Sequence, residues 1–198
     1  MSELPLFPLS GVLLPYGRVS LQIFEPRYID LVRDCMKSNS PFGVVWIRRG
    51  AELAERGRAS PELGDYGTCA HIVDWDQLPN GLLGITIEGA ERFDLFETQT
   101  QANGLVIGQV EVREVLESVR LAEDNQSLLD VLRSLEIHPH VERLNLQVDY
   151  NDAWQVGCTL LQLLPLDESL KYDLLGIDQV DELMIELHGL LNQISGED

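Results

Sequence analysis

Lysine is nearly absent from this sequence, with Lys37 and Lys171 the only two in 198 residues. Acids outnumber bases by 33 to 14, so the formal net charge is −19 at pH 7. Such a charge repels the phosphates of nucleic acids and the headgroups of anionic lipids. We therefore expect no nucleic-acid partner and no membrane partner, whereas basic or neutral polypeptides suit this charge. The alternative is that the acidity serves solubility alone.

Cysteine is also scarce: Cys35, Cys69 and Cys158 make an odd count, and no C-x-x-C pair occurs. This usage indicates buried thiols in a reducing compartment, and not a disulfide framework. The apolar N-terminus lacks a basic start and is interrupted by prolines, which argues against a signal peptide. No apolar run is long enough to cross a bilayer. We expect a cytoplasmic protein.

Motifs of nucleotide-binding and hydrolytic enzymes are missing. The sequence contains no G-x-x-x-x-G-K-[ST], no G-x-S-x-G and no H-E-x-x-H. Two short pairs, Cys69 with His71 and His138 with His140, each offer two ligands where zinc needs at least three from the protein. A Cys–His nucleophile would need an activated thiol, but all three cysteines lie in apolar strand or helix patterns. We expect no catalytic residue, no metal and no cofactor.

The first half of the chain has the pattern of strands, which we expect at 3–9, 18–24, 41–49, 66–78, 82–100 and 105–115. Asn80-Gly81 between two of these runs predicts a hairpin. Residues 50–65 lack apolar periodicity and are expected to form a mobile loop. About six strands with one helix inserted early indicate a compact β-barrel or half-barrel.

From about residue 120 the apolar period becomes that of helices, which we expect at 127–137, 151–164, 166–176 and 177–194. Asp167 and Asp178 are the expected N-caps, Gly176 is the expected stop, and Ile194 is expected to face inward. Four short helices with apolar stripes predict a bundle. The fold class is therefore α+β, with subdomains at 1–117 and 118–198.

Residues 25–28, Glu-Pro-Arg-Tyr, stand where a strand ending at Phe24 passes into an amphipathic helix. Pro26 suits the first helical position, where a missing N–H costs nothing, and Glu25 faces the positive end of the helix dipole. Arg27 is expected to pair with a carboxylate or to cover backbone carbonyls. We interpret the four residues as a structural joint; a ligand-binding role is the alternative. The inward face of the helix is expected to hold Tyr28, Val32, Cys35 and Met36.

Several stretches carry a resemblance to a known family. "LPLFPLSGVLLPYGRVSLQIFEPRY" (4–28) resembles the start of the Lon N-terminal domain family, and its I-F-E-x-R-Y block at 23–28 is the most specific part. "YGTCAHI" (66–72) is similar to a strand of that family. "LPNGLLGITIEGAERF" (78–93) is similar to its hairpin, and the residues at 160–191 resemble its helical tail. The hairpin positions that match are Gly81, Gly89, Arg92 and Phe93.

The resemblance implies a PUA-like β-barrel subdomain with an inserted helix, followed by a C-terminal helical bundle. In full-length Lon proteases this region recognises unfolded or tagged polypeptides and precedes an ATPase and a Ser–Lys protease module. Neither module has room in this chain, so neither activity is carried over. The resemblance therefore implies a free-standing substrate-binding module, and the charge of −19 argues against the RNA binding that a PUA-like fold suggests.

Our leading hypothesis is a non-enzymatic polypeptide-recognition module, an adaptor in protein quality control that works with a protease or chaperone. It would bind unfolded, basic or neutral segments at a groove between the two subdomains. Aromatic rings offer large contact area at small entropic cost, which makes them the candidate binding residues. The alternative for each ring is a core position. The candidates are Tyr16, Phe24, Trp46 and Trp75.

Two other functions remain open from the sequence. One is an enzyme of unrecognised chemistry that uses His71, Cys69 or the Glu25–Arg27 pair. The other is a structural partner that docks to a larger assembly through its helical tail, residues 120–198. Stoichiometric zinc in the purified protein would favour the first, and loss of an interaction on removing the tail would favour the second.

Overall fold

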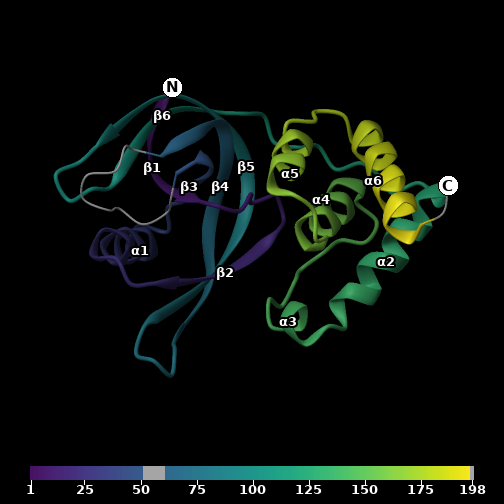
Figure 1. The fold of residues 1–198 in the computed structure, drawn as a ribbon, viewed down its shortest axis with the longest axis horizontal. Coiled ribbons are helices and arrows are strands. Elements are labelled where there is room, and N and C mark those ends of the chain that lie inside the picture. Colours follow the sequence, from purple (N-terminus) through teal and green to yellow (C-terminus); the bar gives the residue numbers. More distant parts are fainter. Residues whose placement is uncertain (51–60, 197–198) are drawn as a thin grey trace. The chain divides into compact units, whose positions relative to one another are not determined.

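The computed structural model describes residues 1–50 and 61–196. Contacts within the chain divide it into two compact units, Met1–Val115 and Leu116–Asp198, which we call the β unit and the helical unit. The β unit is built from strands and one long helix, and the helical unit from helices (Figure 1). The chain therefore combines a sheet with helices, as the sequence predicts.

In the described part of the β unit, six strands form one sheet. Its elements are β1 (Ser2–Leu9), β2 (Arg18–Ile23), α1 (Pro26–Ser38), β3 (Phe42–Arg49), β4 (Glu62–Gln77), β5 (Leu83–Thr100) and β6 (Val106–Val112). The strand order is β2-β5-β4-β3-β1-β6, and β6 also pairs with β5. The sheet thus closes on itself through β5, β4, β3, β1 and β6. Strand β2 lies outside this closed ring and pairs with the first half of β5.

Turn chemistry fixes the hairpin registers of this sheet. Gly81 has φ +81° and donates its N–H to the Leu78 carbonyl at 2.8 Å, so the predicted Asn-Gly turn between β4 and β5 is confirmed. Gly104, with φ +85°, closes the turn between β5 and β6. Both positions require the left-handed backbone that glycine adopts without strain.

Helix α1 covers one part of the sheet and buries an apolar stripe in a core of strand residues (Figure 1). Its buried residues are Tyr28, Leu31, Val32 and Cys35. The prediction that Met36 faces inward is wrong, since Met36 is 43% exposed. At about 100° per residue, Met36 lies roughly 90° from the centre of the buried stripe, on the same side as the exposed Ile29.

The start of β4 differs from the sequence prediction. Glu62 pairs with Arg49 and Leu63 pairs with Ile47, so residues 62–65 belong to a strand and not to the predicted loop. Two register shifts in the β3–β4 ladder break the alternation of apolar residues there, which explains why the sequence pattern did not show the strand. Residues 51–60 of that predicted loop lie outside the described residues.

The helical unit contains α2 (Gln126–Glu136), α3 (Pro139–Glu142), α4 (Ala153–Leu163), α5 (Glu168–Leu175) and α6 (Val180–Ser195), after a short 3₁₀ turn at Glu123–Asn125. Helix α4 is buried over most of its length and contacts both α2 and α6. The sequence missed α3, because a single turn of helix leaves no apolar period. No helix among residues 1–50 and 61–196 is long and apolar enough to span a membrane.

Two positions in the helical unit correct the sequence prediction, Asp178 and Ile194, and two agree with it, Asp167 and Gly176. Gln179 and not Asp178 is the N-cap residue of α6, and Ile194 is 55% exposed because the last turn of α6 extends beyond the core. Asp167 does occupy the N-cap of α5, but its side chain makes no capping hydrogen bond. Gly176 follows α5 with φ −73°, so this helix ends without a left-handed residue.

Candidate functional site

The four aromatic candidates differ in how much of each ring reaches solvent. Phe24 is 51% exposed and Trp75 is 59% exposed, whereas Tyr16 and Trp46 are half-buried. Tyr16 has φ +63°, and its backbone N–H donates to the Gly89 carbonyl at 2.8 Å. The Trp46 indole Nε1–H donates to the Ser10 carbonyl at 3.1 Å. Two rings are therefore tied into the β unit, and two remain open to contact.

Phe24 stands at the rim of a surface hollow of about 180 Å³, which we call the Phe24 hollow. Its lining is mostly apolar, and part of it is the buried ring of Phe7, which stacks on Tyr28 with ring centroids 3.9 Å apart. The lining residues are Phe7, Pro8, Leu9, Ser20, Leu21, Gln22, Ile23, Phe24, Glu25 and Tyr28. The hollow thus joins the end of β1, strand β2 and the start of α1.

Strand pairing explains why this hollow exists. Strand β2 pairs with β5, and β1 pairs with β6 only as far as Leu6. From Phe7 to Leu9, β1 pairs with β3 and no longer with β6. No backbone pairing between β1 and β2 occurs within the described residues, so the hollow is bordered by two strands that do not pair with each other. Phe7, Leu9 and Ile23 in its lining are buried, whereas Phe24 is exposed.

Trp75 borders a second hollow, of about 300 Å³, which we call the Trp75 hollow. It lies between the C-terminal end of α1 and strand β4. Met36 and Val73, which are 43% and 41% exposed, contribute apolar surface beside the indole ring. The lining residues are Cys35, Met36, Asn39, Ser40, His71, Ile72, Val73, Asp74 and Trp75.

The exposure of Trp75 follows from the register of β4. Trp75 pairs with Ile85, and residues that pair directly across a ladder point to the same face of the sheet. Ile85 is only 2% exposed, so the face that carries Trp75 is the core face. A bulge between Ile72 and Asp74 shifts the register just before the indole. Trp75 thus extends the apolar face of the sheet into solvent.

Residues 25–28 connect β2 to α1 through several contacts. Pro26 occupies the first turn of α1, as predicted, and Glu25 takes the N-cap position, although its side chain makes no capping bond. Arg27 pairs with Glu25 at 3.0 Å and donates to the Gly104 carbonyl at 2.7 Å. Its guanidinium also lies over the Tyr28 ring, 4.5 Å from the centroid. Arg27 therefore links the start of α1 to the turn between β5 and β6.

Comparison with known proteins identifies the family. Residues 3–193 match the family described as the ATP-dependent protease La (LON) substrate-binding domain. The chain belongs to this LON substrate-binding domain family. A crystal structure of a Lon N-terminal domain protein from Xanthomonas campestris is 33% identical, with a TM-score of 0.73, and the alignment covers 96% of this chain and 98% of that one.

More distant relatives are similar to this chain in fold or in sequence. The N-terminal domain of Lon protease from the Mycobacterium avium complex is 17% identical over 94% of this chain and 96% of that one, with a TM-score of 0.57, which shows the fold alone. Lon protease of Bacillus thuringiensis is 23% identical over 98% of this chain. Lon protease of Parabacteroides distasonis is 26% identical over 68% of this chain. The chain spans only 24% of the length of the Bacillus thuringiensis protein and 16% of the length of the Parabacteroides distasonis protein.

The thiols of this LON substrate-binding domain lie in surroundings that favour the protonated form. Cys35, Cys69 and Cys158 are all buried, and each is a thiol outside any disulfide. Burial raises the pKa of Cys69 to about 11, with a smaller contribution from the negative charge of Glu91. Burial also raises the pKa of Cys35. Thiols of this kind react slowly, since the thiolate is the nucleophilic form.

The sequence offers the pairs Cys69–His71 and His138–His140 as candidate metal ligands. Cys69 packs in an apolar cluster, whereas His71 lines the Trp75 hollow. The rings of His138 and His140 stack with centroids 5.4 Å apart. Among residues 1–50 and 61–196, no three His, Cys, Asp or Glu side chains are grouped so that they could hold a metal ion.

The raised pKa of Cys69 predicts a pH dependence of stability. Because the folded pKa lies above the ordinary value of 9.0, the folded state holds this proton more tightly than the unfolded state. The resulting stability is complete below pH 9 and is lost as pH rises towards 11. We expect urea unfolding to show a loss on the order of 2 kcal/mol between pH 8 and 11 that Cys69→Ala lacks. Parallel pH profiles of the two proteins would contradict this.

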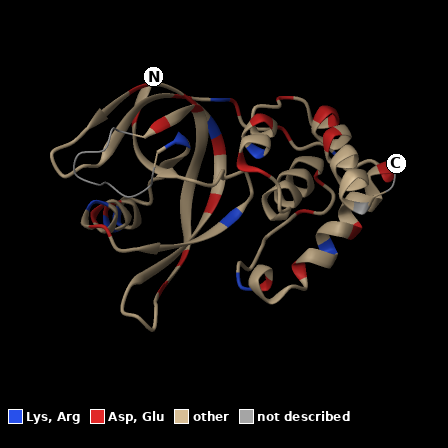
Figure 2. Cartoon of the chain, in the orientation of Figure 1, with Lys and Arg blue, Asp and Glu red and all other residues tan. Residues whose placement is uncertain are grey.

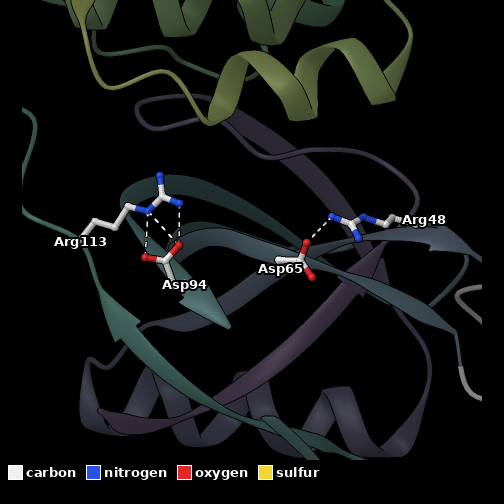
Figure 3. Close-up of polar contacts among 4 residues, drawn as sticks. All are labelled: Arg48, Asp65, Asp94 and Arg113. Atoms are coloured by element: carbon white, nitrogen blue, oxygen red, sulfur yellow. Dashed lines mark hydrogen bonds and ion pairs between the residues drawn. The ribbon is translucent and has the colours of Figure 1, made fainter. Parts of the chain in front are cut away.

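Ion pairs between residues 17 and 19 positions apart connect segments of the β unit, and no sequence pattern predicts them (Figure 3). The Arg113 guanidinium makes a two-point contact with the Asp94 carboxylate, at 2.6 and 3.2 Å, and lies 5.1 Å from the centre of the Tyr66 ring. Arg48 pairs with Asp65 at 2.6 Å. Each partner is far away in the sequence, so only the strand register brings it into reach.

Charge is unevenly divided between the two units of this LON substrate-binding domain. Residues 116–198 contain 17 acids and 4 bases, a net charge of −13, whereas residues 1–115 contain 16 acids and 10 bases, a net charge of −6. Figure 2 shows acids along α5 and α6, with little positive charge beside them. Most of the negative field therefore originates from the helical unit.

Proposed function

We propose that this chain is a non-enzymatic polypeptide-recognition module that binds unfolded, basic or neutral segments through the Phe24 and Trp75 hollows. In the cell it would serve as an adaptor in cytoplasmic protein quality control and present the bound segment to a protease or chaperone. Membership of the LON substrate-binding domain family supports recognition of polypeptides. The observation that carries the proposal is an open aromatic ring beside a hollow at each end of α1.

Physical chemistry favours these two rings as contacts. A large aromatic side chain provides much apolar area with few rotatable bonds, so little entropy is lost when a partner covers it. Phe24 and Trp75 are both more than half exposed; Trp75 stands beside the exposed Met36 and Val73, and Phe24 stands beside the half-buried Leu21. We assign Tyr16 and Trp46 a supporting role, because both are half-buried and hydrogen-bonded to neighbouring segments. Glu25, Pro26, Arg27 and Tyr28 would hold the Phe24 hollow in shape.

We also propose a more specific architecture for the two units. The β unit is a PUA-like barrel and the helices after it form a bundle, with functional subdomains at 1–117 and 118–198. The closed ladder of β1, β3, β4, β5 and β6 supports the first description. The contacts of α4 with α2 and α6 support the second.

The helical unit offers a second candidate function. Ile185 is 69% exposed on α6 and is flanked by the acidic residue Glu186. An exposed isoleucine within an acidic surface of net charge −13 suits docking to a basic partner. In this alternative the chain is a structural partner in a larger assembly. Enzyme chemistry at Cys69 has less support, since its thiol is buried and its pKa is raised.

Binding of an unfolded protein tests the proposal. A reduced and carbamidomethylated protein, labelled with a fluorophore, is titrated with the chain while anisotropy is recorded. We expect the double variant Phe24→Ala, Trp75→Ala to raise the Kd at least about tenfold, as loss of two exposed aromatic contacts commonly does. Phe96→Ala is the matched control, because Phe96 is 56% exposed but lines neither hollow.

The controls separate the two candidate functions. Thermal unfolding of all variants checks that folding is intact, which we expect for substitutions of exposed side chains. If the wild-type protein and the double variant bind unfolded protein with equal affinity, the two hollows are not the binding site. A loss confined to Ile185→Asp would instead favour docking through the helical unit.

A further inference from the structure

The lining of the Trp75 hollow combines an aromatic ring with polar groups. Trp75, Met36 and Val73 supply apolar surface, whereas Asp74 supplies a carboxylate. The carboxylate is fixed close to the indole, because Asp74 Oδ1 accepts the backbone N–H of Trp75 at 2.8 Å. The other polar groups of the lining are the Asn39 amide, the Ser40 hydroxyl and the His71 imidazole.

The end of α1 adds negative potential to this hollow. The helix runs for 13 residues and ends at Ser38, and the next residue, Asn39, adopts a left-handed conformation with φ +51°. A helix carries about half a negative charge at its C-terminal end, and a cation placed there is stabilised. Asp74 contributes a full negative charge. Lys37 is exposed in the last turn of α1 but is not part of the lining.

We propose that the Trp75 hollow binds a Lys or Arg side chain of the bound polypeptide. This inference rests on the proposed function and specifies its substrate class. A cation above an indole face is attracted by the ring quadrupole. The Asp74 carboxylate then accepts a charge-assisted hydrogen bond from the ammonium or guanidinium group. The volume of an ammonium or guanidinium group is only several times that of a water molecule. A hollow of about 300 Å³ is therefore large enough to admit either group.

Charge complementarity identifies the occupant. The chain has a net charge of −19, so basic segments are drawn to its surface and acidic ones are repelled. Arg33, another base of α1, is engaged by Asp30 at 2.8 Å and by Asp34 at 3.2 Å. The hollow therefore combines an accessible carboxylate, a helix C-terminus and an indole ring, which together favour a cation.

The Phe24 hollow differs in chemistry and has a fixed separation from the Trp75 hollow. It is lined mainly by apolar side chains and suits an apolar residue of the same segment. The two linings include residues near opposite ends of α1, about eleven residues apart on average, which corresponds to roughly 16 Å at the helical rise. An extended peptide rises about 3.3 Å per residue. A basic residue four to six positions from an apolar one would thus occupy both hollows.

Labelled twelve-residue peptides test the inference on the full chain. The parent peptide carries one Phe and one Arg five positions apart in a Gly/Ser background. Its three relatives replace the Arg with Lys, Gln or Glu. We expect Lys to preserve binding, Gln to weaken it by about tenfold and Glu to weaken it further. We also expect the preference for Arg over Gln to shrink as salt concentration rises.

Variants of the chain assign the preference to the Trp75 hollow. We expect Asp74→Asn and Trp75→Ala each to reduce the tenfold preference for Arg over Gln to about threefold or less. Phe96→Ala should leave the preference unchanged, because Phe96 is an exposed aromatic outside both hollows. Asp74 and Trp75 are both exposed, so the variants are expected to fold, and thermal unfolding checks this.

The failure of this inference can be told apart from the failure of the proposed function. Equal affinities for the Arg and Gln peptides would overturn the inference, as would a preference that Asp74→Asn and Trp75→Ala leave intact. If unfolded protein still binds the Phe24→Ala, Trp75→Ala variant more weakly than the wild-type chain, the proposed function stands although the cation site is overturned. If no peptide and no unfolded protein binds, both are overturned.

Discussion

Gly89→Ala should destabilise the protein by about 4 kcal/mol, the largest effect that we expect from a single added methyl group. A Cβ at this position would lie 2.1 Å from the Leu14 carbonyl oxygen and 3.1 Å from Thr68 Cγ2. Gly89 also donates its N–H to the Gly17 carbonyl and accepts the Tyr16 N–H. The methyl group would therefore push the segment before β2 away from β5 and break two backbone hydrogen bonds.

A second glycine provides a control of opposite sign. Gly189 lies inside α6, and a Cβ there would meet no atom within 4 Å. Gly189→Ala should raise the free energy of unfolding by about 0.5 to 1 kcal/mol, because alanine favours the helix over the unfolded chain. Urea unfolding followed by circular dichroism measures both changes. Similar stabilities of Gly89→Ala and the wild-type protein would contradict the close contact with Leu14.

Asp152→Ala should cost about 2 to 3 kcal/mol. Asp152 is 3% exposed and caps α4, where its Oδ1 accepts the backbone N–H groups of Trp154 at 2.9 Å and Gln155 at 3.2 Å. A lost N-cap costs about 1 to 2 kcal/mol, and an unsatisfied buried N–H adds to that. Because α4 is the most buried helix of its unit, its destabilisation should affect the whole unit.

Asp167→Ala is the matched control for the Asp152 prediction. Asp167 occupies the N-cap position of α5 with extended backbone, but its side chain makes no capping hydrogen bond. Its replacement should change stability by less than about 0.5 kcal/mol. The two variants are compared by urea unfolding at one pH and salt concentration. Equal decreases in the free energy of unfolding would contradict the prediction, because they would mean that the hydrogen bonds of the Asp152 side chain do not stabilise α4.

Local chemistry made much of the secondary structure predictable from the sequence. Pro26 after an acidic residue marks the start of α1, and Asn80-Gly81 marks the hairpin between β4 and β5. The family resemblance at 23–28 and 78–93 led to the LON substrate-binding domain, which the comparisons confirm. Such features depend on neighbouring residues alone, so a single sequence is sufficient to show them.

The candidate site was less predictable, because exposure depends on register. The sequence could not show that a bulge after Ile72 precedes Trp75, or that Met36 lies at the edge of the buried stripe of α1. Asp74 carried no signal of its own in the sequence. The Arg113–Asp94 pair likewise depends on a ladder between β5 and β6 that only the folded sheet defines.

Hydrogen–deuterium exchange of the full chain, with and without an excess of unfolded protein, tests the central claim most directly. The account predicts slower exchange at the amides of residues 20–25, in α1 and at residues 71–77, and little change in residues 116–198. That pattern would place bound polypeptide at the two hollows of the β unit. Protection confined to the helical unit, or no protection at all, would contradict the account.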